Sequence, residues 1–279
     1  MALVLGCLAA LCWGAGDFAG GLASRRTAAL TVVLATESIG LVLLLAVALL
    51  VSGAPTASDL GYGAGAGILG VAGLALLFRG LATGRASVVA PLSAVGAAVI
   101  QVGWGLLRGE EPGPTALVGI VLALVAIGIV AGAAEEGEAM HRGRRAQELG
   151  YGLGAALGFG VYLVLISETG EGAGLWPLVS ARVAPILLLL AVLPLLRQRL
   201  LTPRSVLPLA AGSGLADAGA NILLLIALRE GLLSLVSPVA NLYPAVTVLL
   251  ARGVQHERLG RPRAIGLGIA LASLVLIAL

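Results

Sequence analysis

The hydrophobic pattern of this 279-residue chain consists of long apolar segments separated by short polar connections. Most segments have about 20 residues, the length at which a helix crosses a bilayer, and they lack the two-residue alternation of barrel strands. The pattern predicts an all-α integral membrane protein with ten transmembrane helices. The predicted spans are residues 2–23, 29–51, 60–81, 86–107, 114–133, 149–167, 176–196, 206–228, 232–252 and 262–279.

The second half of the pattern repeats the first. Residues 84–132 match residues 231–279 without a gap, at a constant offset of 231 − 84 = 147. We therefore expect a first five-helix repeat over 1–133, a charged linker loop over 134–148 and a second repeat over 149–279. Because each half has an odd number of spans, the second enters the membrane from the opposite side, which makes the repeats inverted.

Arginines are concentrated on one side of the predicted membrane. The loops after the first, third, fifth, seventh and ninth spans carry fourteen arginines, and the loops on the other side carry only Arg108 and Arg229. Cytoplasmic loops carry an excess of basic residues, so the count predicts that both termini lie outside.

Composition supports a membrane protein and excludes several other classes. The chain is 59% hydrophobic and 11% charged, with a mean hydropathy of +1.07. Its basic residues, all arginine, are spread over short loops and form no patch for nucleic acid. His141 and His256 lie in loops far from the buried acids, and no nucleotide-binding motif is present. We expect no enzyme activity, no metal and no cofactor, and a location in a bacterial or archaeal cytoplasmic membrane.

Ionisable residues inside the predicted spans are the main candidates for function, because each costs at least roughly 2.5 kcal/mol to insert. Asp17 follows Trp13 by four residues, so both project from one face of the first span. Asp217 lies in the middle of the eighth span, with Asn221 four residues later. This polar stripe indicates either interhelical hydrogen bonding or the lining of a cavity.

Glu37 and Arg182 occupy the second span of each half and superpose at an offset of 182 − 37 = 145. Two interpretations remain open. The residues form a buried ion pair that joins the halves, or Arg182 binds a substrate carboxylate while Glu37 is its resting partner or a proton carrier.

Prolines mark the fourth and ninth spans at matched positions, Pro91 and Pro238, and Pro244 adds a second break to the ninth. Each proline removes a backbone hydrogen bond and permits a bend. The interruption makes Asn241 and Tyr243 candidates for the lining of a pathway; a simple kink that serves helix packing is the alternative for each proline.

Four further residues receive weaker assignments. Gln101 is a candidate lining residue, and Phe159, like Trp13, either stacks on a substrate or fills the core. Glu110 and Glu257 lie at equivalent ends of two spans and are expected to organise turns, a structural role.

Several of these residues are similar to the pattern of a known family. They are Trp13-Gly14, Gly231-Leu-Leu-Ser-Leu-Val-Ser-Pro238, Leu242-Tyr-Pro244, Glu257 and Gly266, with Gly84-Arg-Ala-Ser-Val-Val-Ala-Pro91, Glu110 and Gly119 in the first half. The chain thus resembles the ten-helix EamA-type permeases of the drug/metabolite transporter superfamily. The resemblance implies helices arranged around a central cavity, with the fifth and tenth peripheral, and alternating access that often exports amino acids or related compounds. It also implies termini in the cytoplasm, against the arginine count.

The leading hypothesis is a secondary-active exporter of a small, amino-acid-like or otherwise amphipathic solute, acting as a monomer or homodimer in the lipid bilayer. A proton-coupled exporter of cationic drugs or amines is the alternative, with Asp17 and Glu37 as candidate proton carriers. A channel or a non-transporting scaffold are the alternatives from other classes. A channel needs a continuous polar lining, and a scaffold would leave Asp17, Arg182 and Asp217 dispensable.

Overall fold

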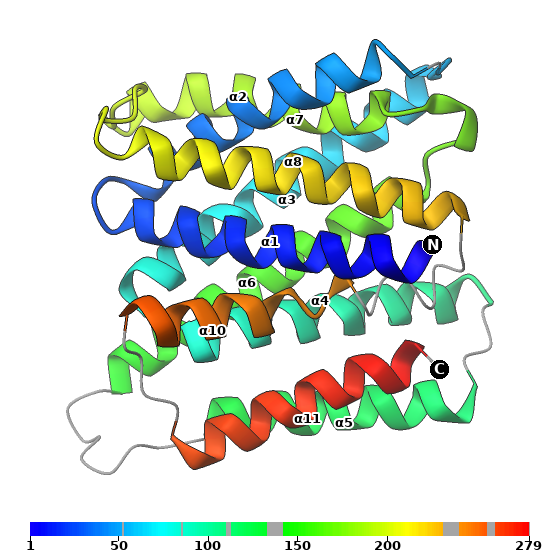
Figure 1. Ribbon diagram of the computed structural model, residues 1–279, viewed down its shortest axis with the longest axis vertical. Coiled ribbons are helices and arrows are strands. Elements are labelled where there is room, and N and C mark those ends of the chain that lie inside the picture. The colour runs from blue at the N-terminus through cyan, green and yellow to red at the C-terminus, as the bar shows by residue number, and fades with distance from the viewer. Residues whose placement is uncertain are drawn as a thin grey trace.

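The computed structural model describes residues 1–51, 53–84, 86–109, 113–132, 142–230, 240–255 and 260–278. Every regular element in these residues is a helix (Figure 1). The α-helices are α1 (Ala2–Ser24), α2 (Ala29–Ala48), α3 (Ala57–Thr83), α4 (Ala86–Leu107), α5 (Pro114–Gly132), α6 (Arg142–Ser167), α7 (Trp176–Leu195), α8 (Leu207–Glu230), α10 (Tyr243–Gln255) and α11 (Arg261–Ala278). A 3-10 turn, η2 (Glu171–Ala173), precedes α7.

Two regions differ from the elements predicted from hydropathy. Helix α6 begins at Arg142, so the second part of segment 134–148, expected to be a loop, is helical. Helical hydrogen bonding does not depend on hydropathy, and the helix continues through an arginine-rich segment that the apolar pattern cannot detect. In the predicted span 232–252, residues 241–242 form a turn and α10 begins at Tyr243.

Seven of the described helices are long and apolar enough to cross a membrane. Their outward faces are apolar as well: Val42 of α2 is 70% exposed and Leu187 of α7 is 62% exposed. A soluble protein rarely leaves large contiguous apolar patches in water, whereas lipid chains cover such faces. The chain is therefore a multi-pass integral membrane protein.

Helix packing follows the sequence repeat. In chain order α1, α2, α3, α4 and α5 correspond to α6, α7, α8, α10 and α11. The main helix contacts come in pairs that exchange under this correspondence: α1–α8 with α3–α6, α2–α8 with α3–α7, and α1–α10 with α4–α6. Helices α2 and α5 pack against their own counterparts, α7 and α11. A pseudo-two-fold axis between the two halves produces this pattern.

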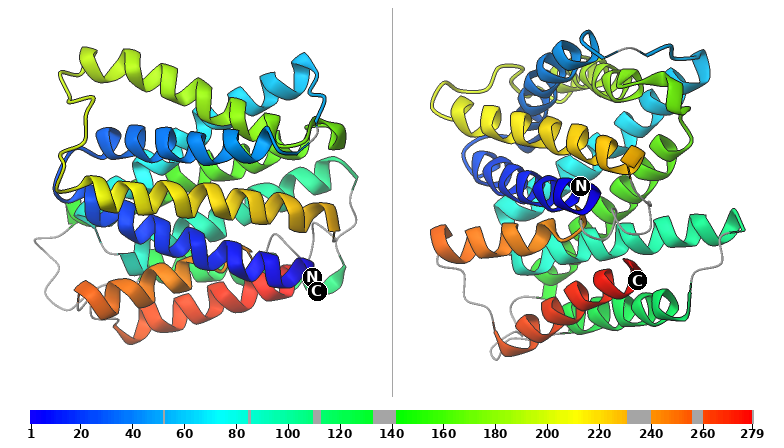
Figure 2. Two further views of the ribbon diagram at one scale, coloured as in Figure 1. Left: turned by 45° about the horizontal axis from the view of Figure 1, so that its top comes forward. Right: turned by 45° about the vertical axis from the view of Figure 1, so that its right-hand side comes forward.

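Helices α5 and α11 lie side by side at one end of the molecule, and α2 and α7 lie at the other (Figures 1 and 2). The remaining helices cross between them. Buried apolar residues of α1, α2, α3, α7 and α8, including Val32, Phe78 and Leu193, form the largest core cluster. This packing places the polar residues of the spans in the middle of the molecule.

Candidate functional site

A cavity lies between the two halves of the chain. The space not occupied by protein atoms is about 730 Å³ there, including the part that is open to solvent. All the described α-helices except α5 and α11 contribute to its lining, together with Asn241. The lining residues are Trp13, Asp17, Glu37, Gly67, Gly70, Val71, Leu74, Ala97, Phe159, Tyr162, Leu163, Ala181, Arg182, Asp217, Asn221, Asn241 and Tyr243. The cavity therefore lies where the two halves move against each other if the chain rocks about its pseudo-two-fold axis.

Close contacts between backbones hold the helices around this cavity. A Cβ atom on Gly67 would lie 2.0 Å from the carbonyl oxygen of Ala181, so only glycine permits α3 to approach α7 here. A Cβ on Gly14 would lie 2.6 Å from the carbonyl oxygen of Tyr243, so glycine also permits the close approach of α1 to the start of α10. In membrane proteins small residues commonly allow the backbones of neighbouring helices to approach closely.

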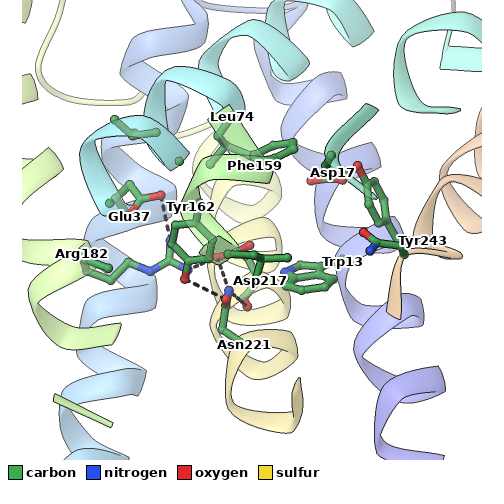
Figure 3. A pocket seen from close by; sticks show the side chains of 17 residues that line it. Trp13, Asp17, Glu37, Leu74, Phe159, Tyr162, Arg182, Asp217, Asn221 and Tyr243 are labelled. Atoms are coloured by element: carbon green, nitrogen blue, oxygen red, sulfur yellow. Dashed lines mark hydrogen bonds and ion pairs between the residues drawn. The ribbon is translucent and has the colours of Figure 1, made fainter. Parts of the chain in front are cut away.

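Arg182 is the centre of a polar network across four helices (Figure 3). Its Nη1 donates to Glu37 Oε1 at 2.8 Å, and its Nη2 donates to Asp217 Oδ2. Asn221 Nδ2 donates to Asp217 Oδ2 at 3.3 Å, and the Tyr162 hydroxyl donates to Asn221 Oδ1 at 3.1 Å. Glu37 and Arg182 form an ion pair, as one of the two interpretations of the sequence has it, and Asp217 is a second carboxylate partner that was not paired with the arginine from the sequence.

Burial within the network is uneven. The side chains of Arg182 and Glu37 are 7% and 5% exposed, whereas that of Asp217 is 17% exposed. A solute in the cavity therefore reaches Asp217 more readily than Glu37. Displacing Asp217 exposes one edge of the guanidinium while Glu37 continues to hold the other.

Asp17 lies across the cavity from this network, next to Tyr243 (Figure 3). Its residue is 8% exposed, and within the described part of the chain no hydrogen bond or ion pair joins its carboxylate to another residue. Trp13 and Tyr243 form an edge-to-face pair with ring centroids 6.2 Å apart. A carboxylate beside two aromatic rings provides a favourable environment for an ammonium group.

The turn before α10 also contributes to the cavity. Asn241 is 5% exposed and lines the cavity. The hydroxyl groups of Tyr243 and of Ser93 in α4 share a hydrogen bond of 3.0 Å, in which either can be the donor. Pro244 is the second residue of α10, where a missing N–H costs nothing because the first helical turn has no internal acceptor for it. Thr247 donates to the Gly14 carbonyl at 3.2 Å and so fixes the start of α10 against α1.

The remaining predicted residues have mixed placements. Phe159 lines the cavity, whereas Gln101 does not: it lies one turn beyond Ala97, which does. Pro91 lies within α4. Pro238, Glu110 and Glu257 lie outside the described residues.

Two residues next to the network were not predicted from the sequence. Tyr162 follows Phe159 by three residues, so the helical spacing places both on one face of α6. Pro185 lies inside α7 and has no N–H, so the carbonyl of Ala181 lacks its usual helical donor beside Arg182. The sequence signal for both is their spacing: Tyr162 lies three residues after Phe159, and Pro185 lies three residues after Arg182.

The described residues contain no group of three or more His, Cys, Asp or Glu side chains that could hold a metal ion. Three carboxylates and one guanidinium line the cavity. If all four groups are ionised, the site carries two net negative charges in a medium of low dielectric, which is costly. The arrangement therefore favours the uptake of protons or of a cationic group.

Fold and site together define a multi-span helical membrane protein with two related halves around a central polar cavity. The model of the EamA-like transporter family matches residues 1–132 and 148–279, nearly the whole chain in two segments. The chain belongs to the EamA-like transporter family. It is a membrane transporter of small solutes and not an enzyme.

Two further comparisons concern individual proteins. A search of curated protein sequences finds no match. A solved structure, titled only as the crystal structure of a protein, is similar to the chain with a TM-score of 0.66 at 15% sequence identity. The match covers 99% of this chain and 96% of the other, so it describes the same fold over the full length.

Proposed function

We propose that the chain is a secondary-active carrier that exports a small amphipathic solute with a carboxylate and an ammonium group, by alternating access. The observation that carries the proposal is the division of the cavity into two polar regions. Arg182 and its partners lie on one side, and Asp17 with its aromatic neighbours lies on the other. An amino-acid-like zwitterion has complementary charges for both regions.

The carboxylate of the solute binds the Arg182 guanidinium by displacing Asp217, the more exposed of its two partners. A guanidinium holds a carboxylate through two parallel hydrogen bonds, which fixes the orientation of the solute as well as binding it. The ammonium group then lies toward Asp17, between the rings of Trp13 and Tyr243.

Protons are the proposed coupling ions. In the empty cavity the excess of carboxylates favours protonation of one or more acids, and Asp17 is the candidate because no guanidinium neutralises it. An arriving ammonium group competes with that proton. Solute and proton therefore occupy the site alternately, as an antiporter requires.

Binding to the purified protein tests the proposed solute. A thermal-shift panel compares L-amino acids with their methyl esters, which lack the carboxylate, and their N-acetyl derivatives, which lack the ammonium group. The proposal expects stabilisation only by solutes with both groups. Arg182→Met is expected to abolish the shift, because the carboxylate loses its partner. Asp17→Asn is expected to weaken the shift and to remove its dependence on pH, because the ammonium group and the proton lose their shared site.

Cationic drugs or amines are the second candidate solutes, supported by the ratio of three carboxylates to one guanidinium in the lining. In that case simple amines and methyl esters stabilise the protein and amino acids do not. Arg182 is then a structural partner of Glu37 and Asp217, and the Arg182→Met variant retains amine binding whenever it folds.

A further inference from the structure

The loops α1–α2 and α7–α8 form one basic surface at the edge of the molecule, where both lie together (Figures 1 and 2). Thr31, in the first turn of α2, donates from Oγ1 to the Arg199 carbonyl at 2.7 Å, and Thr202 donates back to the Thr31 carbonyl at 3.2 Å. These two bonds fix the loops against each other. We call their surface the basic patch; its exposed arginines are Arg25, Arg26, Arg197, Arg199 and Arg204.

The basic patch has no internal counter-charge. Residues 25–28 and 196–206 contain five arginines and no acidic residue. Surface arginines of a soluble protein are usually accompanied by acids, whereas arginines on the cytoplasmic side of a membrane protein face anionic lipid headgroups.

Exposed leucines flank two of these arginines on both sides. Around Arg197 and Arg199 the chain reads Leu-Leu-Arg-Gln-Arg-Leu-Leu over residues 195–201, with Leu195 82% exposed and Leu201 84% exposed. Apolar side chains beside cationic heads suit the boundary between headgroups and acyl chains, where the leucines contact chains and the arginines extend to phosphate.

The backbone at Arg197 provides an independent indication that its side chain is used. Helix α7 ends in a Schellman motif: Arg197 N donates to the Pro194 carbonyl at 3.0 Å, and Gln198 N donates to the Leu193 carbonyl at 2.9 Å. Arg197 has φ 54°, the left-handed conformation that this position requires and that glycine adopts without strain. An arginine at this position has a cost in backbone strain that glycine would avoid, which favours a role for its side chain outside the helix cap.

We propose that the basic patch is a binding site for the headgroup of an anionic phospholipid, held by Arg197, Arg199 and Arg204 with its acyl chains against the exposed leucines. Each arginine near an anionic surface contributes about fivefold in affinity. Binding there fixes the ends of α2, α7 and α8, the helices that carry Glu37, Arg182 and Asp217. This inference does not depend on which solute the cavity accepts.

Thermal unfolding of the purified full-length chain in neutral detergent tests the proposal, with dioleoyl phosphatidylglycerol or dioleoyl phosphatidylcholine added at equal mole fraction. Phosphatidylglycerol is expected to raise the Tm by several degrees more than phosphatidylcholine does, and the difference is expected to shrink with salt because headgroup contacts are screened. Equal shifts from the two lipids contradict the proposal, as does reproduction of the shift by glycerol phosphate without acyl chains.

A matched pair of variants localises the site. The triple substitution Arg197→Gln, Arg199→Gln and Arg204→Gln is expected to lose most of the phosphatidylglycerol shift. The control removes three other exposed arginines by Arg79→Gln, Arg252→Gln and Arg261→Gln and is expected to keep it. An equal loss in both triples indicates a diffuse effect of net charge and overturns the proposal.

The single substitution Arg197→Gly separates lipid binding from folding and serves even if the triple variants fold poorly. Relief of the left-handed strain is expected to raise the Tm in detergent alone, while the phosphatidylglycerol shift becomes smaller. A lower Tm in detergent with an unchanged lipid shift makes Arg197 a purely structural residue and refutes the assignment.

Discussion

Removal of the Arg182 guanidinium is the most direct perturbation of the buried network. Arg182→Met keeps most of the side-chain volume and leaves Glu37 and Asp217 without their cation. Breaking a buried ion pair from one side costs about 3–5 kcal/mol, because the remaining charge stays desolvated. Asp217 is 17% exposed and is hydrated through the cavity, so the cost comes chiefly from Glu37, which is 5% exposed. We therefore expect a value near the lower limit, about 3 kcal/mol.

The loss is measured as thermal unfolding of the purified protein in detergent. At about 2–4 °C for each kcal/mol, Arg182→Met should lower the Tm by about 6–12 °C. The double variant Arg182→Met with Glu37→Gln removes the uncompensated charge and should recover most of that loss. A decrease of less than about 2 °C for the single variant, or a double variant as unstable as the single, would refute the assignment of a desolvated ion pair.

Three other substitutions test separate parts of the structure. Gly67→Ala should lower stability by about 1–3 kcal/mol, because the added Cβ meets the backbone of α7. Gly65→Ala on the same helix should be tolerated, because the nearest atom to its added Cβ is 3.6 Å away. Equal Tm values for the two variants would contradict the close approach of α3 to α7. Tyr162→Phe should lower stability by about 1 kcal/mol through loss of one partly buried hydrogen bond, seen as a small decrease in Tm. An unchanged Tm would exclude that bond. The hydrogen bond from Arg108 holds the pKa of Glu168 below its usual range, so this carboxylate stabilises the fold at neutral pH and loses that effect as the pH falls through its lowered pKa. The difference in Tm between wild type and Glu168→Gln should therefore be present at pH 7 and vanish in acid; a difference that grows in acid would have the wrong sign.

Hydropathy predicted most of the helices, because crossing a bilayer imposes a length and an apolar composition that are visible in a single sequence. It missed the first turns of α6, where the residues from Arg142 onward are polar. Those turns lie at the end of a helix. Their helical geometry depends on backbone hydrogen bonds and local packing, which do not require apolar residues in the sequence.

The repeat predicted more of the site than composition did. Matching offsets placed Glu37 and Arg182 at equivalent positions, and the ion pair between them is present. Asp217 was predicted as a candidate but not as a partner of Arg182, and Tyr162 was not predicted at all, because contacts between α6, α7 and α8 depend on how the helices rotate against one another. Gln101 lies one turn away from the cavity for a different reason: the sequence spacing predicts which face of α4 it occupies but not how far along the helix the cavity extends.

Solute counterflow in proteoliposomes tests the central claim, that the two polar regions of the cavity bind the transported solute. Vesicles preloaded with an unlabelled amino acid that stabilises the protein should transiently accumulate the labelled compound with saturable kinetics. Arg182→Met with Glu37→Gln, and separately Asp17→Asn, should abolish accumulation, while the control Gly65→Ala retains it. Flux that does not saturate would indicate a channel, and counterflow unaffected by these substitutions would contradict the proposed site.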